Sequence, residues 1–119
     1  MATVNYTAGD QFVDAWLYTV TPLTTTNADS QALYYQGSGD RSIQITGTFG
    51  VGGTVIVEGT NDGTNWFQLR DPSNAAISFT AAGIKAILEN CWAVRARVTA
   101  GDGTTAITAI FCIRRNRNG

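Results

Sequence analysis

The segment from Gly52 to Asp71 constrains the fold of this chain more than any other, because it has the pattern of a β-hairpin. It begins with a run rich in β-branched residues, Thr54 to Gly59, and ends with an aromatic and apolar run, Trp66 to Leu69. Between these runs, Asn61-Asp62-Gly63 has the small, amide-rich chemistry that allows positive φ and a reversal of direction. The sequence therefore predicts two antiparallel strands joined by a tight turn.

Similar short strands are predicted along most of the chain. Arg41 to Phe49 and Trp92 to Val98 alternate between apolar and polar residues, which is typical of strands with one buried face. In the second strand we expect Trp92, Val94, Ala96 and Val98 to face inward, and Ala93, Arg95 and Arg97 to face outward. Gly101-Asp102-Gly103 predicts another hairpin turn. Thr105 to Ile113 is apolar on both faces, which predicts a strand in the middle of a sheet or under a partner.

Seven or eight short strands with frequent turns predict an all-β fold, an antiparallel β-sandwich of the jelly-roll or Ig-like kind. At most one short helix is expected, in the segment from Thr80 to Asn90, where Gly83 weakens the helical pattern. The predicted organisation is an N-terminal arm (1–11), a β-sandwich domain (12–113) and a basic C-terminal tail (114–119).

The charge of the chain is low and unevenly distributed. Charged residues make up 14% of the sequence, against about 25% in an average soluble domain. Weakly charged surfaces repel each other little, so this composition favours stable association. Residues 1–84 carry two arginines against seven acids, for a net charge of −5, and residues 85–119 carry +4. We expect these two parts to pair within the fold or head-to-tail between copies.

The residue types that carry most enzymatic chemistry are scarce. The chain has no histidine, which excludes Ser-His-Asp and Cys-His arrangements and histidine metal sites. Its glutamates do not suggest a catalytic carboxylate pair, and Glu58 is expected on the outward face of a strand. Cys91 and Cys112 are expected on neighbouring strands as two half-buried thiols, in a chain made in a reducing cytoplasm. We therefore predict no enzyme, no cofactor and no metal site.

Aromatic residues are the better candidates for a binding role. Tyr34 and Tyr35 must point to opposite faces, so one of them is expected to be exposed. Trp66 points away from Phe67 and Leu69 if those two are buried. It would then contact a sugar or a protein partner, or cover the end of the sandwich beside its own hairpin. Trp16 and Tyr18, which share a face, are expected in the core or in an interface patch.

The arginines near the C-terminus form a second group of candidates. Together they could make a basic stripe that binds acidic partners, or they could protect a sheet edge and keep the chain soluble. The acidic net charge and the lack of interleaved aromatics disfavour nucleic acid as the partner. The predicted partner-binding residues are Tyr34, Tyr35, Trp66, Arg95, Arg97, Arg114, Arg115 and Arg117.

Three segments, 53–66 (GTVIVEGTNDGTNW), 79–84 (FTAAGI) and 94–98 (VRARV), resemble small structural proteins of tailed-phage virions, namely capsid decoration, cement or head-fibre subunits. The resemblance covers about the last two thirds of the chain, and its motifs are turn and strand signatures. It implies a β-sandwich or jelly-roll fold without catalytic residues.

The resemblance also implies partners and a location. They are the major capsid protein, further copies of the chain in a dimer or trimer, and the capsid surface of a virion that is assembled in the host cytoplasm. The alternatives are a carbohydrate-binding module of a receptor-binding fibre, or a tail or head–tail structural subunit. No apolar run approaches the ~18–20 residues of a membrane span, so a membrane partner is not expected.

Overall fold

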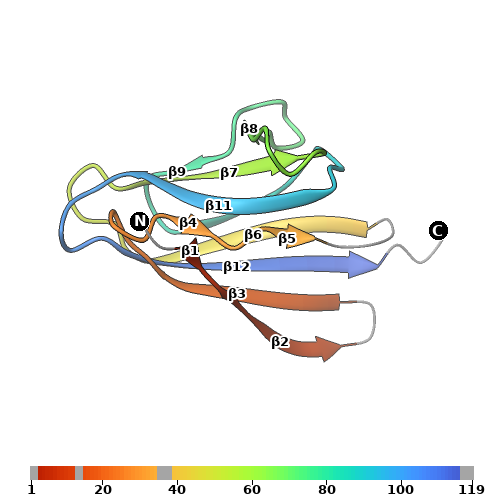
Figure 1. Ribbon diagram of the computed structural model, residues 1–119, viewed down its shortest axis with the longest axis horizontal. Coiled ribbons are helices and arrows are strands. Elements are labelled where there is room, and N and C mark those ends of the chain that lie inside the picture. Colours follow the sequence, from red (N-terminus) through yellow and green to blue (C-terminus); the bar gives the residue numbers. More distant parts are fainter. Residues whose placement is uncertain (1–2, 13–14, 35–38, 116–119) are drawn as a thin grey trace.

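The computed structural model describes residues 3–12, 15–34 and 39–115, and these form two β-sheets packed face to face (Figure 1). The seven-stranded sheet contains β1 (Thr3–Val4), β4 (Asp29–Ser30), β5 (Leu33–Tyr34), β7 (Thr54–Thr60), β8 (Phe67–Gln68), β9 (Ser78–Phe79) and β11 (Ala93–Ala100). The five-stranded sheet contains β2 (Tyr6–Phe12), β3 (Ala15–Leu23), β6 (Gly39–Thr48), β10 (Gly83–Ala86) and β12 (Ala106–Arg115). The predicted all-β sandwich is therefore confirmed.

Almost all strand pairs are antiparallel. The five-stranded sheet has the order β10-β6-β12-β3-β2, and the seven-stranded sheet has the order β1-β4-β11-β7-β8. β5 also pairs with β11, and β9 also pairs with β7. β1 and β4 are the exception and run parallel. The segment expected as an arm supplies β1 to the seven-stranded sheet and most of β2 to the five-stranded sheet. No helix that could cross a membrane occurs in the described part of the chain.

The predicted hairpin is present. β7 and β8 pair antiparallel, with Glu58 opposite Gln68, and the turn between them contains Gly63 at a φ of 80°. Glycine suits that position because other residues rarely adopt positive φ. Asp62 and the neighbouring polar residues bond to one another, so the turn is closed by its own side chains.

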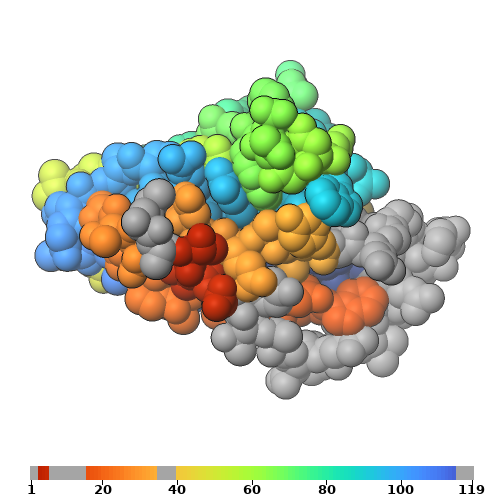
Figure 2. Space-filling view, in the orientation of Figure 1, coloured from red at the N-terminus to blue at the C-terminus, as the bar shows by residue number. Residues whose placement is uncertain are grey.

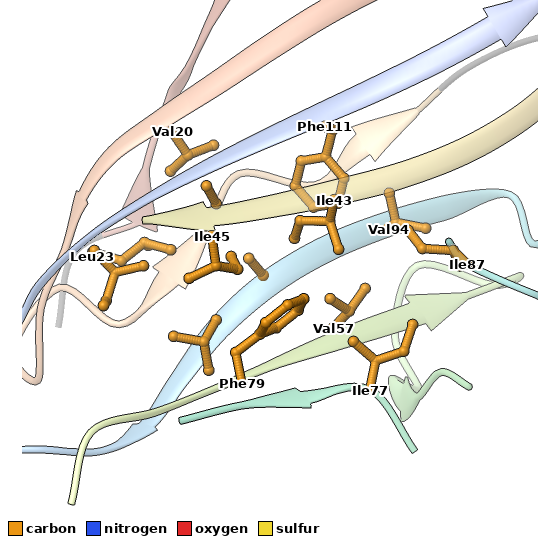
Figure 3. Packing of buried hydrophobic residues seen from close by; sticks show 14 of the residues in the cluster. Val20, Leu23, Ile43, Ile45, Val57, Ile77, Phe79, Ile87, Val94 and Phe111 are labelled. Atoms are coloured by element: carbon orange, nitrogen blue, oxygen red, sulfur yellow. The ribbon is translucent and has the colours of Figure 1, made fainter. Parts of the chain in front are cut away.

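The core lies between the facing sides of the two sheets (Figure 3). β6 contributes Ile43 and Ile45, as its alternation predicts. The core residues of β7, β11 and β12 are Val55, Val57, Val94, Ala96, Val98, Ile107, Ala109, Phe111 and Ile113. Trp16 and Tyr18 pack against this cluster from β3, so the core interpretation of that pair is confirmed. β12 lies mid-sheet, between β6 and β3.

The helix expected between Thr80 and Asn90 is not formed. The segment is extended, and β10 within it pairs with the edge of β6. Of the residues placed on one helical face, Ile87 is buried, whereas Ile84 and Leu88 are exposed. Backbone hydrogen bonds to the edge of β6 replace the hydrogen bonds that a helix would have formed, and Gly83 already weakened that helix. Tertiary pairing therefore decides the conformation of this segment.

The hairpin expected at 101–103 is also absent, because β11 and β12 belong to different sheets. The turn instead carries the chain from one layer to the other, next to the crossover between β6 and β7. Asp102 joins the two crossovers by accepting a hydrogen bond from the Val51 N–H at 2.9 Å. Cys91 and Cys112 therefore do not lie on paired strands, and both are free, half-buried thiols.

Trp92 is not a core residue, although the strand pattern predicts that it is. β11 begins one residue later, at Ala93, so the alternation of the strand does not extend to Trp92. Its side chain is 50% exposed. Ala93, expected outward, is buried between Tyr34 and Thr60 of the flanking strands.

Candidate functional site

The outer face of the seven-stranded sheet, which is turned away from the other sheet, carries a network of ion pairs. Arg95 of β11 lies opposite Glu58 of β7, and its Nη2 is 2.9 Å from Glu58 Oε1. Arg97 Nε lies 3.2 Å from Asp29 Oδ1, and its Nη1 lies 3.9 Å from Glu58 Oε1. The outward position predicted for Glu58 is confirmed. The predicted basic pair is balanced by two carboxylates, so it does not form a cationic stripe by itself.

Trp66 lies on the same face. The guanidinium carbon of Arg95 is 4.2 Å from the centroid of the Trp66 ring, which is the geometry of a cation–π contact. The half-buried ring thus covers the sheet next to its own hairpin. This position corresponds to the second of the two roles expected for Trp66.

An aromatic pair lies at the start of β11. The Tyr34 and Trp92 rings have centroids 4.6 Å apart and are tilted by 60°. The Trp92 backbone N–H donates to Asn61 Oδ1 at 2.9 Å, and a Cβ added to Gly63 would lie 3.3 Å from the Trp92 ring. The hairpin turn and the segment before β11 therefore hold each other in place. In Figure 2 the green hairpin turn, the cyan segment before β11 and the orange region of β5 lie on one side of the molecule.

Arg114, another predicted contact residue, is not brought to this aromatic pair. Arg114 is exposed at the end of β12, where it lies opposite Asp40 of β6. Tyr35 and Arg117 lie outside the described residues, and the side chain of Arg115 is not described either.

The turn that supports Trp92 is organised around one carboxylate. Asp62 Oδ1 accepts hydrogen bonds from the backbone N–H groups of Asn65 and Thr64 at 2.8 Å and from the Thr60 hydroxyl at 2.9 Å. Asp62 Oδ2 accepts from Asn65 Nδ2 at 2.7 Å. The Asn65 and Thr64 amides, followed by the two side chains, hold the pKa of Asp62 well below its ordinary value. This carboxylate therefore shapes the turn and is poorly suited to accept a proton from a substrate.

A hollow of about 450 Å³ lies beside the turn. The hollow is lined by Phe67, which is 69% exposed, and by Leu69 and Cys91 together with the turn residues. An ion pair borders it, with Arg70 Nε 2.9 Å from Glu89 Oε2 and the Arg70 backbone N–H 2.8 Å from Glu89 Oε1. The expected burial of Phe67 is wrong: β8 is only two residues long, and both of its residues are exposed.

The titratable groups at the hollow do not form a catalytic set. Burial alone would raise the pKa of Glu89, but the hydrogen bonds from Arg70 outweigh it and hold the pKa below its usual range. Burial raises the pKa of the Cys91 thiol, which makes it a weak nucleophile at neutral pH. No group of three His, Cys, Asp or Glu side chains that could hold a metal lies within 3–12, 15–34 and 39–115. The described side chains offer stacking surfaces and hydrogen-bonding groups, which suit binding.

Sequence reasoning found Tyr34 but missed Trp92, Phe67 and the Arg70–Glu89 pair. Nothing local marks Trp92 as exposed, because its partner Tyr34 lies far away in the sequence and meets it only through the pairing of β5 with β11.

Comparisons with protein-family models, with curated proteins and with solved structures give no match to this chain.

Proposed function

We propose that this chain is a structural binding protein of a tailed-phage virion, a decoration or cement subunit that attaches to the major capsid lattice. The observation that carries the proposal is the exposed aromatic pair of Tyr34 and Trp92, whose rings are in contact and whose side chains are 49% and 50% exposed. Large aromatic side chains supply much of the binding energy in protein interfaces. Trp92 is already held by Asn61 and Tyr34, so its ordering costs little on binding.

The charge distribution and the sequence resemblance give further support. Arg95 and Arg97 are balanced within the fold by Glu58 and Asp29, so this sheet face does not repel a neighbouring protein strongly. The hairpin that resembles those of virion proteins is the one that supports Trp92. Attachment can be weak for a single contact, because several copies on a rigid lattice gain avidity of about 10²–10⁴.

The test is co-sedimentation of the purified chain with empty capsids that lack it. Trp92→Ala is expected to weaken attachment at least about 30-fold, as for an interface residue worth about 2 kcal/mol. The matched control is Val51→Ala, which truncates a more accessible apolar side chain, 81% exposed, in the crossover after β6. Melting temperatures of both variants verify the fold. Equal attachment of Trp92→Ala and wild type would exclude this surface, and failure of wild type to sediment would overturn the cement proposal.

The hollow favours a second candidate, binding of a carbohydrate. Its volume of about 450 Å³ suits a small saccharide, and it places the exposed Phe67 ring beside the amides of Asn61, Asn65 and Gln68. An aromatic face and planar hydrogen-bonding groups are what a sugar needs for stacking and for its hydroxyls. Binding to a glycan array that is lost in Phe67→Ala but kept in Trp66→Ala would favour this function over capsid attachment.

A further inference from the structure

We propose that the outer face of the five-stranded sheet is a self-association interface, through which two copies of this chain pack sheet against sheet. The inference goes beyond capsid attachment and does not require it. It starts from β12, whose apolar residues lie on both faces. A mid-sheet position accounts for the inner face of β12, which is part of the core, but not for the outer face. Where one face of a sheet is exposed to water, the strand residues on that face are normally polar.

Strand register defines the outer face row by row. One row runs Ile84, Gln44, Ile110, Thr19; the next runs Ala86, Ser42, Cys112, Leu17; a third runs Thr46, Thr108, Thr21. The residues between these positions, such as Ile43, Ile45, Ala109 and Phe111, point into the core, so the rows point away from it. Every side chain in the three rows is uncharged.

The apolar members of these rows are accessible. Ile84 is 64% exposed, and Leu17, Ile110 and Cys112 are partly exposed. The outer face of the other sheet is different, because Arg95, which is paired with Glu58, lies at its centre. The two faces of the sandwich therefore have different chemistry, one ionic and one apolar with hydroxyl and amide groups.

A second copy of the chain is the occupant that fits this face. In a two-fold interface each side chain meets the same surface of its partner, so a charged face tends to oppose like charges. The three rows are uncharged and meet their copies without that cost. Towards the end of β12 the same face carries Asp40 and Arg114, which lie opposite each other and have opposite charges. Two such sheets also share one twist, which lets them pack about 10 Å apart and within about 30° of each other.

The available area is sufficient for a dimer. The five strands are 4 to 10 residues long. At about 3.3 Å per residue and about 4.8 Å between strands, the face covers on the order of 600 Å² per copy. A pair of copies would bury roughly 1,200 Å², which reaches the lower limit of stable interfaces.

The experiment is light scattering after size exclusion, with the full chain loaded from about 1 µM to about 100 µM, a range that covers weak dimers. Wild type is expected to reach the mass of a dimer. Ile110→Glu places a carboxylate in the middle of the face and is expected to raise the dissociation constant at least about 100-fold. The matched control is Ile56→Glu, a partly exposed isoleucine of β7 that lies opposite Arg97 on the ionic face; it should stay dimeric.

A second readout uses the wild-type protein alone. Alkylation of Cys112, in the second row, is expected to slow as the concentration rises, while the rate at Cys91, on the other sheet's side, stays constant. A monomer at every concentration would overturn the proposal. So would a dimer that dissociates with Ile56→Glu but not with Ile110→Glu, or a Cys112 rate independent of concentration. Capsid co-sedimentation of Ile110→Glu reports attachment separately, so failure of either proposal can be recognised.

Discussion

Gly59 is the position where a single methyl group should perturb the structure most informatively. It is buried in β7, at the edge of the hollow. A Cβ built there would lie 2.5 Å from Cys91 Sγ and 2.9 Å from both terminal carbons of Leu69. Ordinary contacts of a Cβ lie at 3.4–4 Å, so neighbouring atoms must move by about 0.5–1 Å. Leu69 is buried and cannot move freely.

Overpacking of this size costs about 1–3 kcal/mol, so Gly59→Ala should be destabilised by that amount. For a chain of this length, each kcal/mol lowers the melting temperature by roughly 3–6 °C. The assay is urea unfolding followed by tryptophan fluorescence, with differential scanning calorimetry as a second measurement. The control is Gly103→Ala, where no atom lies within 4 Å of the added Cβ and φ is not positive. That variant should stay within about 0.5 kcal/mol of wild type or gain slightly.

A double variant identifies the cause. Cys91→Ala removes the sulfur atom that the new methyl group would meet most closely, so combining it with Gly59→Ala should recover about 0.5 kcal/mol or more relative to additivity. If Gly59→Ala is as stable as the wild-type protein, the close approach of β7, Cys91 and Leu69 is refuted. Strict additivity of the double variant would refute the part assigned to the sulfur.

Three further predictions concern acid stability, thiol reactivity and the core. Hydrogen bonds, chiefly from the Thr104 hydroxyl, lower the pKa of Asp102 to about 2. Its contribution to stability is therefore complete above pH ~4 and is lost as the pH falls towards 2; Asp102→Asn should flatten this part of an acid titration monitored by circular dichroism. Cys91, whose pKa is raised by burial, should be alkylated more slowly in the folded chain than in guanidinium at pH 8, and equal rates would contradict its burial. Ile45→Ala, in the core, should lose about 2–5 kcal/mol in urea unfolding, whereas Ile84→Ala, at the exposed edge, should lose less than about 1 kcal/mol.

The sequence alone determines the local elements of this protein. The hairpin of β7 and β8 follows from β-branched residues on either side of an Asn-Asp-Gly turn, and the inward faces of β6 and β11 follow from a period of two. These signals are local, because turn chemistry and strand alternation depend on neighbouring residues. They are also sufficient for the fold class, since strands with one apolar face must pack against another sheet.

Tertiary structure decides which strands become neighbours. The turn at 101–103 specifies a reversal of the chain, but β11 and β12 each find other partners, so the turn connects the two sheets. The segment around β10 becomes a strand because the edge of β6 is available to it.

The same reason governs the candidate site. Trp92 is exposed beside Tyr34 because β5 pairs with β11, and Arg95 is neutralised because Glu58 lies opposite it on β7. Each of these contacts joins residues that are distant along the chain. Local patterns specify a strand and its two faces, but the energy of strand pairing depends on every competing edge in the molecule, and only the complete fold selects among them.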